Sequence, residues 1–115
     1  MFMSCKTCDW ALVHSDGVPP HDIAVKATND RLISLVDAGL MQYIRGDVPL
    51  QDMLDLAYSE MRYTIVSYLK CESCGRTRFW GLCIRGAPIY KVVKESDPDR
   101  WNWEAVPPRE LWARS

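Results

Sequence analysis

Histidine, long apolar runs and excess charge of either sign are all scarce in this sequence. The 115 residues include two histidines, and 14 basic and 15 acidic side chains leave a net charge of −1. Uncharged runs reach only seven residues, as in 63–69, whereas a membrane-spanning helix needs about 20 apolar residues. A phosphate-cradling Gly-x-x-x-x-Gly-Lys sequence is also absent. We therefore expect no membrane span, no phosphate-binding loop of this type and weak long-range attraction to nucleic acid.

A secretory signal is also missing from the start of the chain. Its first eight residues, Met-Phe-Met-Ser-Cys-Lys-Thr-Cys, carry a charge and two cysteines where a signal peptide has its apolar core. This favours a cytoplasmic location, in which cysteines stay reduced. Apolar residues make up 48% of the chain and charged residues 25%, which is typical of a globular protein. A single domain spanning 1–115 is the expectation for this length.

What the sequence does contain is cysteine in a regular pattern. Four of its five cysteines form two Cys-x-x-Cys pairs, Cys5 with Cys8 and Cys71 with Cys74. Two intervening residues let a tight turn aim both sulfurs at one point, so each pair supplies half of a tetrahedral shell. Gly75, after the second pair, permits the positive φ that a turn leaving a metal often needs. The pattern predicts a structural Zn²⁺ site, with disulfides, a redox dithiol or unrelated free thiols as the alternatives.

The two pairs resemble the zinc knuckles of zinc-ribbon proteins, in which the metal joins two hairpins. This resemblance covers the two pairs, at 5–8 and 71–74, and the strands beside them. It implies that Cys5, Cys8, Cys71 and Cys74 are the metal ligands. Pairs of this kind are commonly about 15–20 residues apart, whereas residues 9–70 separate them here. A large insertion between the knuckles is therefore expected.

Two helices are predicted inside that insertion, within residues 28–61. In the first, Leu32, Leu35 and Val36 recur at the spacing of one helical face. The second has a clear apolar face, consisting of Leu50, Met53, Leu54, Ala57, Tyr58 and Met61. Its polar face is acidic and carries Gln51, Asp52, Asp55, Ser59 and Glu60. Both apolar faces are interpreted as core-facing.

Strand character dominates after the second helix. Residues 63–70, 77–84 and 89–93 are rich in β-branched and aromatic side chains, and they predict a three-stranded antiparallel meander. The first of these runs is apolar on both faces, so it should lie centrally in the sheet. A short strand at 10–13 is expected to leave the first cysteine pair, while 41–45 fits either a strand or more helix. The predicted fold is thus α+β, a zinc-ribbon-like meander of about three strands with two inserted helices.

The C-terminal segment, residues 94–115, is rich in tryptophan. It holds Trp101, Trp103 and Trp112, three of the five tryptophans in the chain. A disordered tail would not usually carry such side chains. The favoured interpretation is that they pack across the sheet; the alternative is that they anchor a partner.

Catalysis is the least supported class of function. A closed shell of four cysteines leaves the metal no open position for water, so the metal should be structural. The fifth cysteine, Cys83, lies in an apolar run and is expected to be a small core residue. A nucleophilic role for it would require a histidine base, and His14 and His21 both lie in a loop-like region. No enzyme activity and no small-molecule substrate are predicted.

Binding of another protein is the favoured function. Its predicted contact residues are Asp52, Asp55 and Glu60 on the acidic helix, together with Trp101 and Trp103. In size and mixed α/β layout, the chain also loosely resembles the small bacterial immunity proteins. That resemblance implies a tight one-to-one complex with a toxin, often a nuclease, whose basic active site is offset by acidic side chains.

Nucleic-acid binding is the alternative, because many zinc ribbons bind nucleic acid or associate with transcription. Arg76, Arg78 and Arg85 alternate with aromatic residues, which could form a strip combining charge with stacking. The near-neutral net charge weighs against this alternative, since electrostatic attraction dominates affinity for nucleic acid.

Overall fold

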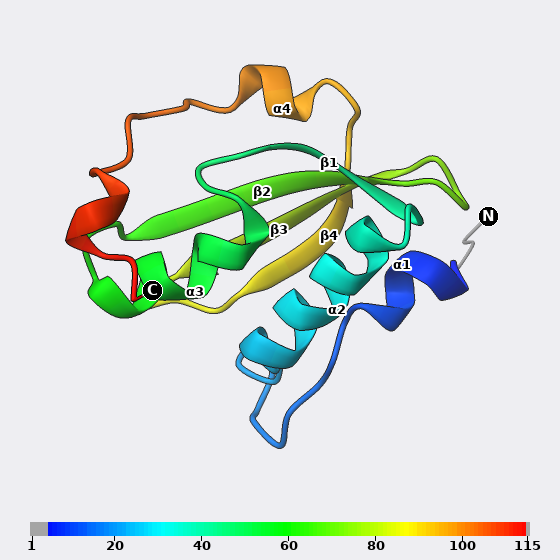
Figure 1. The fold of residues 1–115 in the computed structure, drawn as a ribbon. Helices are drawn as coiled ribbons and strands as arrows, with labels where there is room; N and C mark the ends of the chain where they lie inside the picture. Colours follow the sequence, from blue (N-terminus) through cyan, green and yellow to red (C-terminus); the bar gives the residue numbers. More distant parts are fainter. Residues whose placement is uncertain (1–4, 115) are drawn as a thin grey trace.

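A single antiparallel sheet organises the computed structural model, which describes residues 5–114 (Figure 1). The strands follow one another in the order β1-β2-β3-β4 across the sheet. They comprise β1 (Met41–Gly46), β2 (Thr64–Cys71), β3 (Thr77–Cys83) and β4 (Ile89–Val93). The α+β class is confirmed, and β2 lies centrally between β1 and β3 as predicted.

The expected strand number of three is wrong, because β1 adds a fourth strand. The preceding helix ends at Asp37, and Gly39 just beyond it has a φ of +76°, which is available to glycine without a side-chain clash. Leu40 then donates its N–H to the carbonyl of Leu35 at 2.9 Å, and the chain reverses. Met41 consequently lies opposite Cys71 and covers the edge of β2. The sequence of residues 41–45 fits either a strand or more helix, and pairing with the distant strand β2 makes them a strand.

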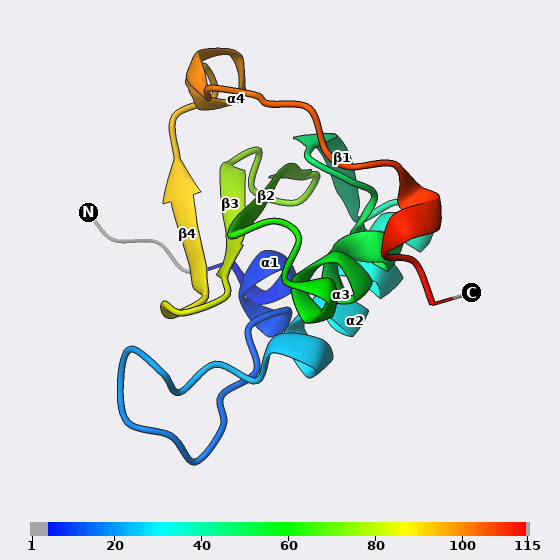
Figure 2. The same ribbon diagram turned by 90° about the vertical axis from the view of Figure 1, so that its left-hand side faces the viewer.

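The helices that precede the C-terminal segment cover one face of this sheet, and that segment, with its own short helix, crosses the other (Figure 2). The helices are α1 (Lys6–Trp10), α2 (Val25–Asp37), α3 (Leu50–Ser59) and α4 (Asp97–Arg100), with a 3₁₀ turn, η1 (Arg109–Leu111). We call the face that packs on α2 and α3 the inner face and the opposite one the outer face. No helix within residues 5–114 has the length and apolar character needed to cross a membrane.

The strand expected at 10–13 is wrong, since the chain is helical through Trp10 and then irregular. The Asp9 carboxylate accepts the N–H of Cys5 at 3.0 Å, and the Asp9 N–H donates to the Cys5 carbonyl at 2.9 Å. These two bonds close a helical turn around the first cysteine pair. Among the neighbouring residues that the structure describes, the β-type pairing is an isolated bridge between His14 and Ile23.

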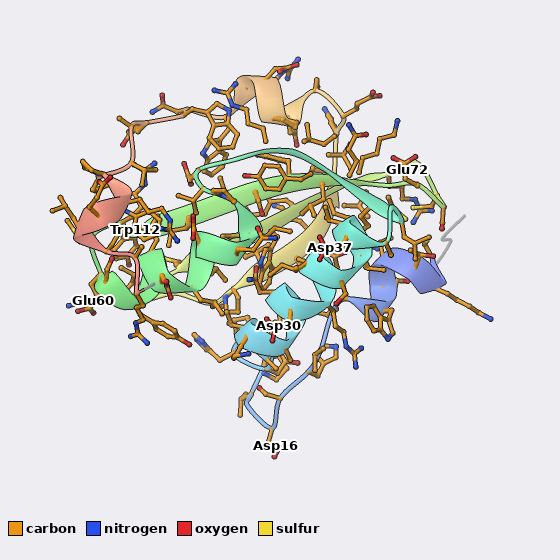
Figure 3. All side chains as sticks on the ribbon, in the orientation of Figure 1. Asp16, Asp30, Asp37, Glu60, Glu72 and Trp112 are labelled. Atoms are coloured by element: carbon orange, nitrogen blue, oxygen red, sulfur yellow. The ribbon has the colours of Figure 1, made fainter. Side chains whose placement is uncertain are left out.

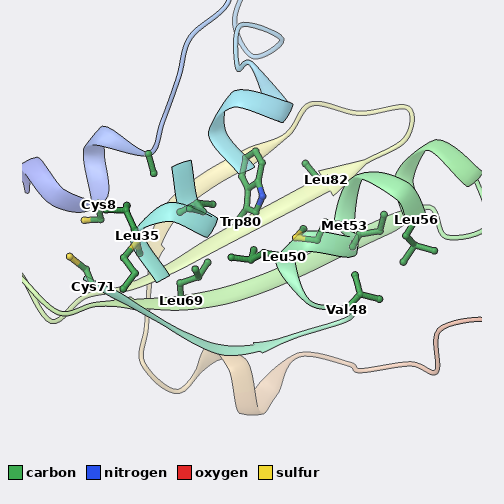
Figure 4. Packing of buried hydrophobic residues seen from close by; sticks show 14 of the residues in the cluster. Cys8, Leu35, Val48, Leu50, Met53, Leu56, Leu69, Cys71, Trp80 and Leu82 are labelled. Atoms are coloured by element: carbon green, nitrogen blue, oxygen red, sulfur yellow. The ribbon is translucent and has the colours of Figure 1, made fainter. Parts of the chain in front are cut away.

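The inner core is organised around Trp80 of β3, which is fully buried (Figure 4). Its indole N–H donates to the side-chain oxygen of Asn29 on α2 at 3.1 Å. The Asn29 amide in turn donates to the carbonyl of Leu50 at 3.0 Å. One buried amide therefore joins α2, α3 and the sheet while satisfying their polar groups.

α3 buries most of the apolar face that its periodicity predicts, with Leu50 and Met53 buried and Leu54 and Ala57 packed against the core, but its boundary is shifted. Leu56 is fully buried, whereas Tyr58 is 56% exposed. The reason is the C-terminal segment, which lies along α3 and places Trp112 in the same core cluster as Leu56. The helix is therefore covered on two sides, by the sheet and by this segment.

The outer face carries a separate aromatic cluster. Tyr68 and Phe79 are buried there beneath Trp101 and Trp103. The rings meet edge to face or tilted, with centroids 5.3 Å apart for Tyr68 and Phe79 and 6.0 Å apart for Tyr68 and Trp103. Such arrangements are favourable for aromatic pairs. The C-terminal segment thus forms a second layer across the sheet.

Candidate metal centre

Four cysteine sulfurs converge where α1 meets the turn between β2 and β3. The Sγ atoms of Cys5, Cys8, Cys71 and Cys74 all lie within 4.8 Å of one another. Cys5 is 3.7 Å from Cys71, and Cys8 is 3.7 Å from Cys74, measured between sulfurs. A tetrahedron with Zn–S bonds of about 2.3 Å has sulfurs about 3.8 Å apart. The four cysteines are therefore spaced as ligands of one metal ion, and all four are free thiols.

Local backbone geometry aims each pair at the centre. In the helical turn of α1, Cys5 and Cys8 are three residues apart and lie on the same side. In the second pair, the Gly75 N–H donates to the Cys71 carbonyl at 2.8 Å, and Gly75 has a φ of +74°. A hydroxyl contact of 2.8 Å between Thr7 and Ser73 joins the two turns directly. One knuckle is therefore helical, unlike the paired hairpins that the zinc-ribbon resemblance implied.

The cysteines are largely withdrawn from water. Cys8 and Cys71 are fully buried and come from opposite sides of the centre (Figure 4). A hydrogen bond from the backbone N–H of Cys8 lowers the pKa of Cys5 to about 7. Burial raises the pKa of Cys8, and the hydrogen bond from Arg78 opposes that rise. Both bonds favour the thiolate forms that bind metals.

Arg78 lies beside these sulfurs, on the inner face of β3. It is 7% exposed, and its Nη2 donates to the Cys8 sulfur at 3.2 Å and to the Asp9 carboxylate. Its guanidinium lies 4.8 Å from the ring centroid of Tyr90, whose hydroxyl donates to the Cys8 carbonyl at 2.7 Å. The Arg78 Nε is buried without a hydrogen-bond partner among the described residues. The Arg78 side chain therefore places a buried positive charge and a hydrogen-bond donor beside the cysteine sulfurs.

The sequence analysis placed Arg78 on a surface strip with Arg76 and Arg85. Alternation along β3 would have revealed its true position, because Arg78 has the same parity as the core residue Trp80. Arg76 lies just before β3, and exposed Arg85 lies just beyond its other end. The three arginines therefore do not form one continuous strip.

The acidic residues predicted on α3 have different surroundings. Asp52 accepts from Arg109 Nε at 3.2 Å and Nη2 at 3.1 Å. Asp55 accepts the backbone N–H of Arg114 at 3.0 Å. Both carboxylates thus hold the C-terminal segment, while Glu60 is exposed at the end of the helix.

The remaining candidates are the tryptophans and the fifth cysteine. Trp101 and Trp103 pack in the outer aromatic cluster, and the Trp103 indole N–H donates to the Pro98 carbonyl at 2.8 Å. Cys83 ends β3 and is half-buried, where the sequence analysis expected a core position. It lines a cavity described below. Neither tryptophan lies at the cysteine centre.

Comparison with protein-family models, curated proteins and solved structures finds no match to this chain. The proposed function therefore rests on the residues of this chain and their geometry.

Proposed function

We propose that this protein is a non-enzymatic binding protein whose fold is held together by a structural zinc ion. The observation that carries the metal assignment is the set of four sulfurs at tetrahedral separations. Four thiolates are the typical ligand set of structural zinc sites and leave no position for a substrate or catalytic water. A role in binding follows from this closed centre more readily than a role in catalysis.

A protein partner is proposed ahead of nucleic acid because the basic residues are poorly placed for a phosphate backbone. Arg78 is buried and hydrogen-bonded to Cys8 and Asp9, and the net charge of the chain is −1. Nucleic-acid affinity depends mainly on neutralising phosphates with accessible basic side chains. The most specific form of the proposal is an immunity-type inhibitor that binds a toxin, such as a nuclease, in a one-to-one complex.

Native mass spectrometry of the protein purified from its own host, with metal analysis of the same sample, tests both parts. We expect one zinc per chain and a co-purifying protein. Absence of metal would contradict the zinc assignment, and bound nucleic acid would favour the alternative function.

A salt titration of the purified complex distinguishes the two kinds of partner. Affinity for nucleic acid falls steeply between about 50 and 200 mM salt, by roughly 10³-fold or more when several phosphates are contacted. A mainly apolar protein interface weakens far less with salt, and we expect the complex of this protein to lose less than tenfold in affinity over that range. A steep log-log slope would contradict the proposal.

A further inference from the structure

The end of the molecule opposite the cysteine centre has an unusually apolar surface. We call residues 58–64, which join α3 to β2, the α3–β2 corner. Tyr58 is 56% exposed there, Met61 43% and Tyr63 56%. Glu60 in this corner and Glu72, between the two cysteines of the second pair, lie at opposite ends of the sheet (Figure 3). A surface here is therefore separate from the metal centre.

Two cavities flank the α3–β2 corner. The first has a volume of about 350 Å³ and is walled mainly by aliphatic side chains, including Leu54, Ile65 and Leu82. It lies at the small end of the roughly 300–1,000 Å³ range typical of ligand pockets, which suits a protruding side chain better than a large cofactor. The second, of about 490 Å³, is lined by Met61 and Tyr63 among others.

Each cavity also has an acidic residue in its lining. Glu60 is the charged residue of the first cavity, and Glu104 lines the second. Glu60 has a φ of +59° and ψ of 15°, a left-handed conformation at the end of α3 where glycine or asparagine is usual. This conformation places Glu60 in the lining of the mainly apolar first cavity. Among residues 5–114, Glu60 forms no ion pair.

The basic side chains beside the corner are already engaged within the chain. Arg62 donates to Asp47 at 3.3 Å and to the Ala105 carbonyl at 3.0 Å. Arg114 stacks on Tyr58, with its guanidinium 4.8 Å from the ring centroid. Arg114 keeps its charge, but among the described residues that line the first cavity Glu60 is the only charged one, so the charge at that cavity is negative.

From this arrangement we infer that the α3–β2 corner docks a protein segment in which an apolar side chain is adjacent to a lysine or arginine. The apolar side chain enters the cavity walled by Leu54, Ile65 and Leu82, and the basic residue pairs with Glu60. A buried apolar anchor beside a charged rim is the usual composition of an energetic centre in protein interfaces. This inference rests on the proposed protein-binding function and adds its location and the chemistry of the partner.

A second apolar patch, at the metal end, is the competing location. Trp10 and Leu40 are each 45% exposed and line a cavity with Lys6. Lys6 is the charged residue in its lining, so this patch would favour a partner segment that carries an acidic residue. The two patches therefore make distinct predictions.

Site-specific photo-crosslinking in the protein's own host tests the location. The photoreactive residue p-benzoylphenylalanine replaces Tyr58 in one variant and Trp10 in another, and circular dichroism of each purified variant verifies its fold. We expect a one-to-one adduct from position 58 only, attached to a segment with an apolar residue next to lysine or arginine. An adduct from position 10 alone would overturn the inference and preserve protein binding. No adduct from either position would overturn both.

Charge reversal then tests the chemistry. Glu60→Lys in the Tyr58 photo-crosslinking variant should reduce the adduct at least tenfold, because the partner's cation loses its counter-charge. Glu95→Lys, at an exposed position between β4 and α4, is the matched control and should leave the yield unchanged. An adduct that Glu60→Lys does not diminish, or one on a segment without a basic residue, would overturn the proposed pairing.

Discussion

At the scale of single residues, Arg78 is predicted to support metal binding without being a ligand itself. A zinc ion with four thiolates carries a net charge of −2, and a buried guanidinium 3.2 Å from the Cys8 sulfur offsets part of it. Arg78→Gln should weaken zinc binding by about 10- to 100-fold, the usual cost of removing a group that supports the ligands. Competition with a chromophoric chelator measures this affinity. Exposed Arg85→Gln is the control, and equal affinities for the two variants would contradict the prediction.

Asn29 is the residue on which the polar groups of the inner core depend. Asn29→Ala would leave the Trp80 indole N–H and the Leu50 carbonyl buried without their present partner. Each unsatisfied group costs about 1–3 kcal/mol, so we expect the free energy of unfolding to fall by about 2–5 kcal/mol. Urea denaturation of the zinc-loaded protein measures this change. A loss below about 1 kcal/mol would show that water replaces the amide.

At the scale of elements, apolar anchoring should hold the C-terminal segment more strongly than its ion pair does. Trp112 is 6% exposed, and its indole N–H donates to the Pro107 carbonyl at 2.8 Å. Trp112→Ala should destabilise the protein by about 3–5 kcal/mol. Asp52→Asn, which weakens the pair with half-exposed Arg109, should destabilise the protein much less than Trp112→Ala does. Comparing the two variants by thermal unfolding tests this order, and a larger effect of Asp52→Asn would reverse it.

At the scale of the whole molecule, metal binding and folding should be coupled. The centre ties α1 to the β2–β3 turn across the 62 residues of 9–70, and binding energy available only in the folded state stabilises that state. Chelation, or Cys71→Ser, should therefore abolish cooperative unfolding as followed by circular dichroism. Cys83→Ser, a half-buried cysteine outside the centre, is the control and should change little. An intact spectrum after metal removal would contradict a structural role.

Local patterns explain why much of this organisation was predictable from the sequence. Two residues between cysteines constrain the turn whatever surrounds it, so the four cysteines that come together were apparent from the sequence. A run that is apolar on both faces, as in 63–70, has to lie inside a sheet, and β2 does. Helical spacing likewise located α2 and α3, because burying an apolar face is the main source of helix stability in proteins.

Contacts between distant segments account for what the sequence did not reveal. Residues 41–46 became β1 because the edge of β2 was available to pair with them. Asp52 and Asp55 looked like an exposed acidic face until the C-terminal segment, more than 50 residues later, supplied Arg109 and Arg114. Neither outcome has a signal within a local window of residues.

The sequence by itself determined the α+β class and the four cysteines of the metal centre, since both depend on spacing between near neighbours. Only the tertiary structure decided that the first knuckle is helical, that Arg78 points toward the Cys8 sulfur, and that Glu60 stands at the lip of an apolar cavity. The physical reason is that a side chain's charge partner and exposure depend on which distant segments pack against it.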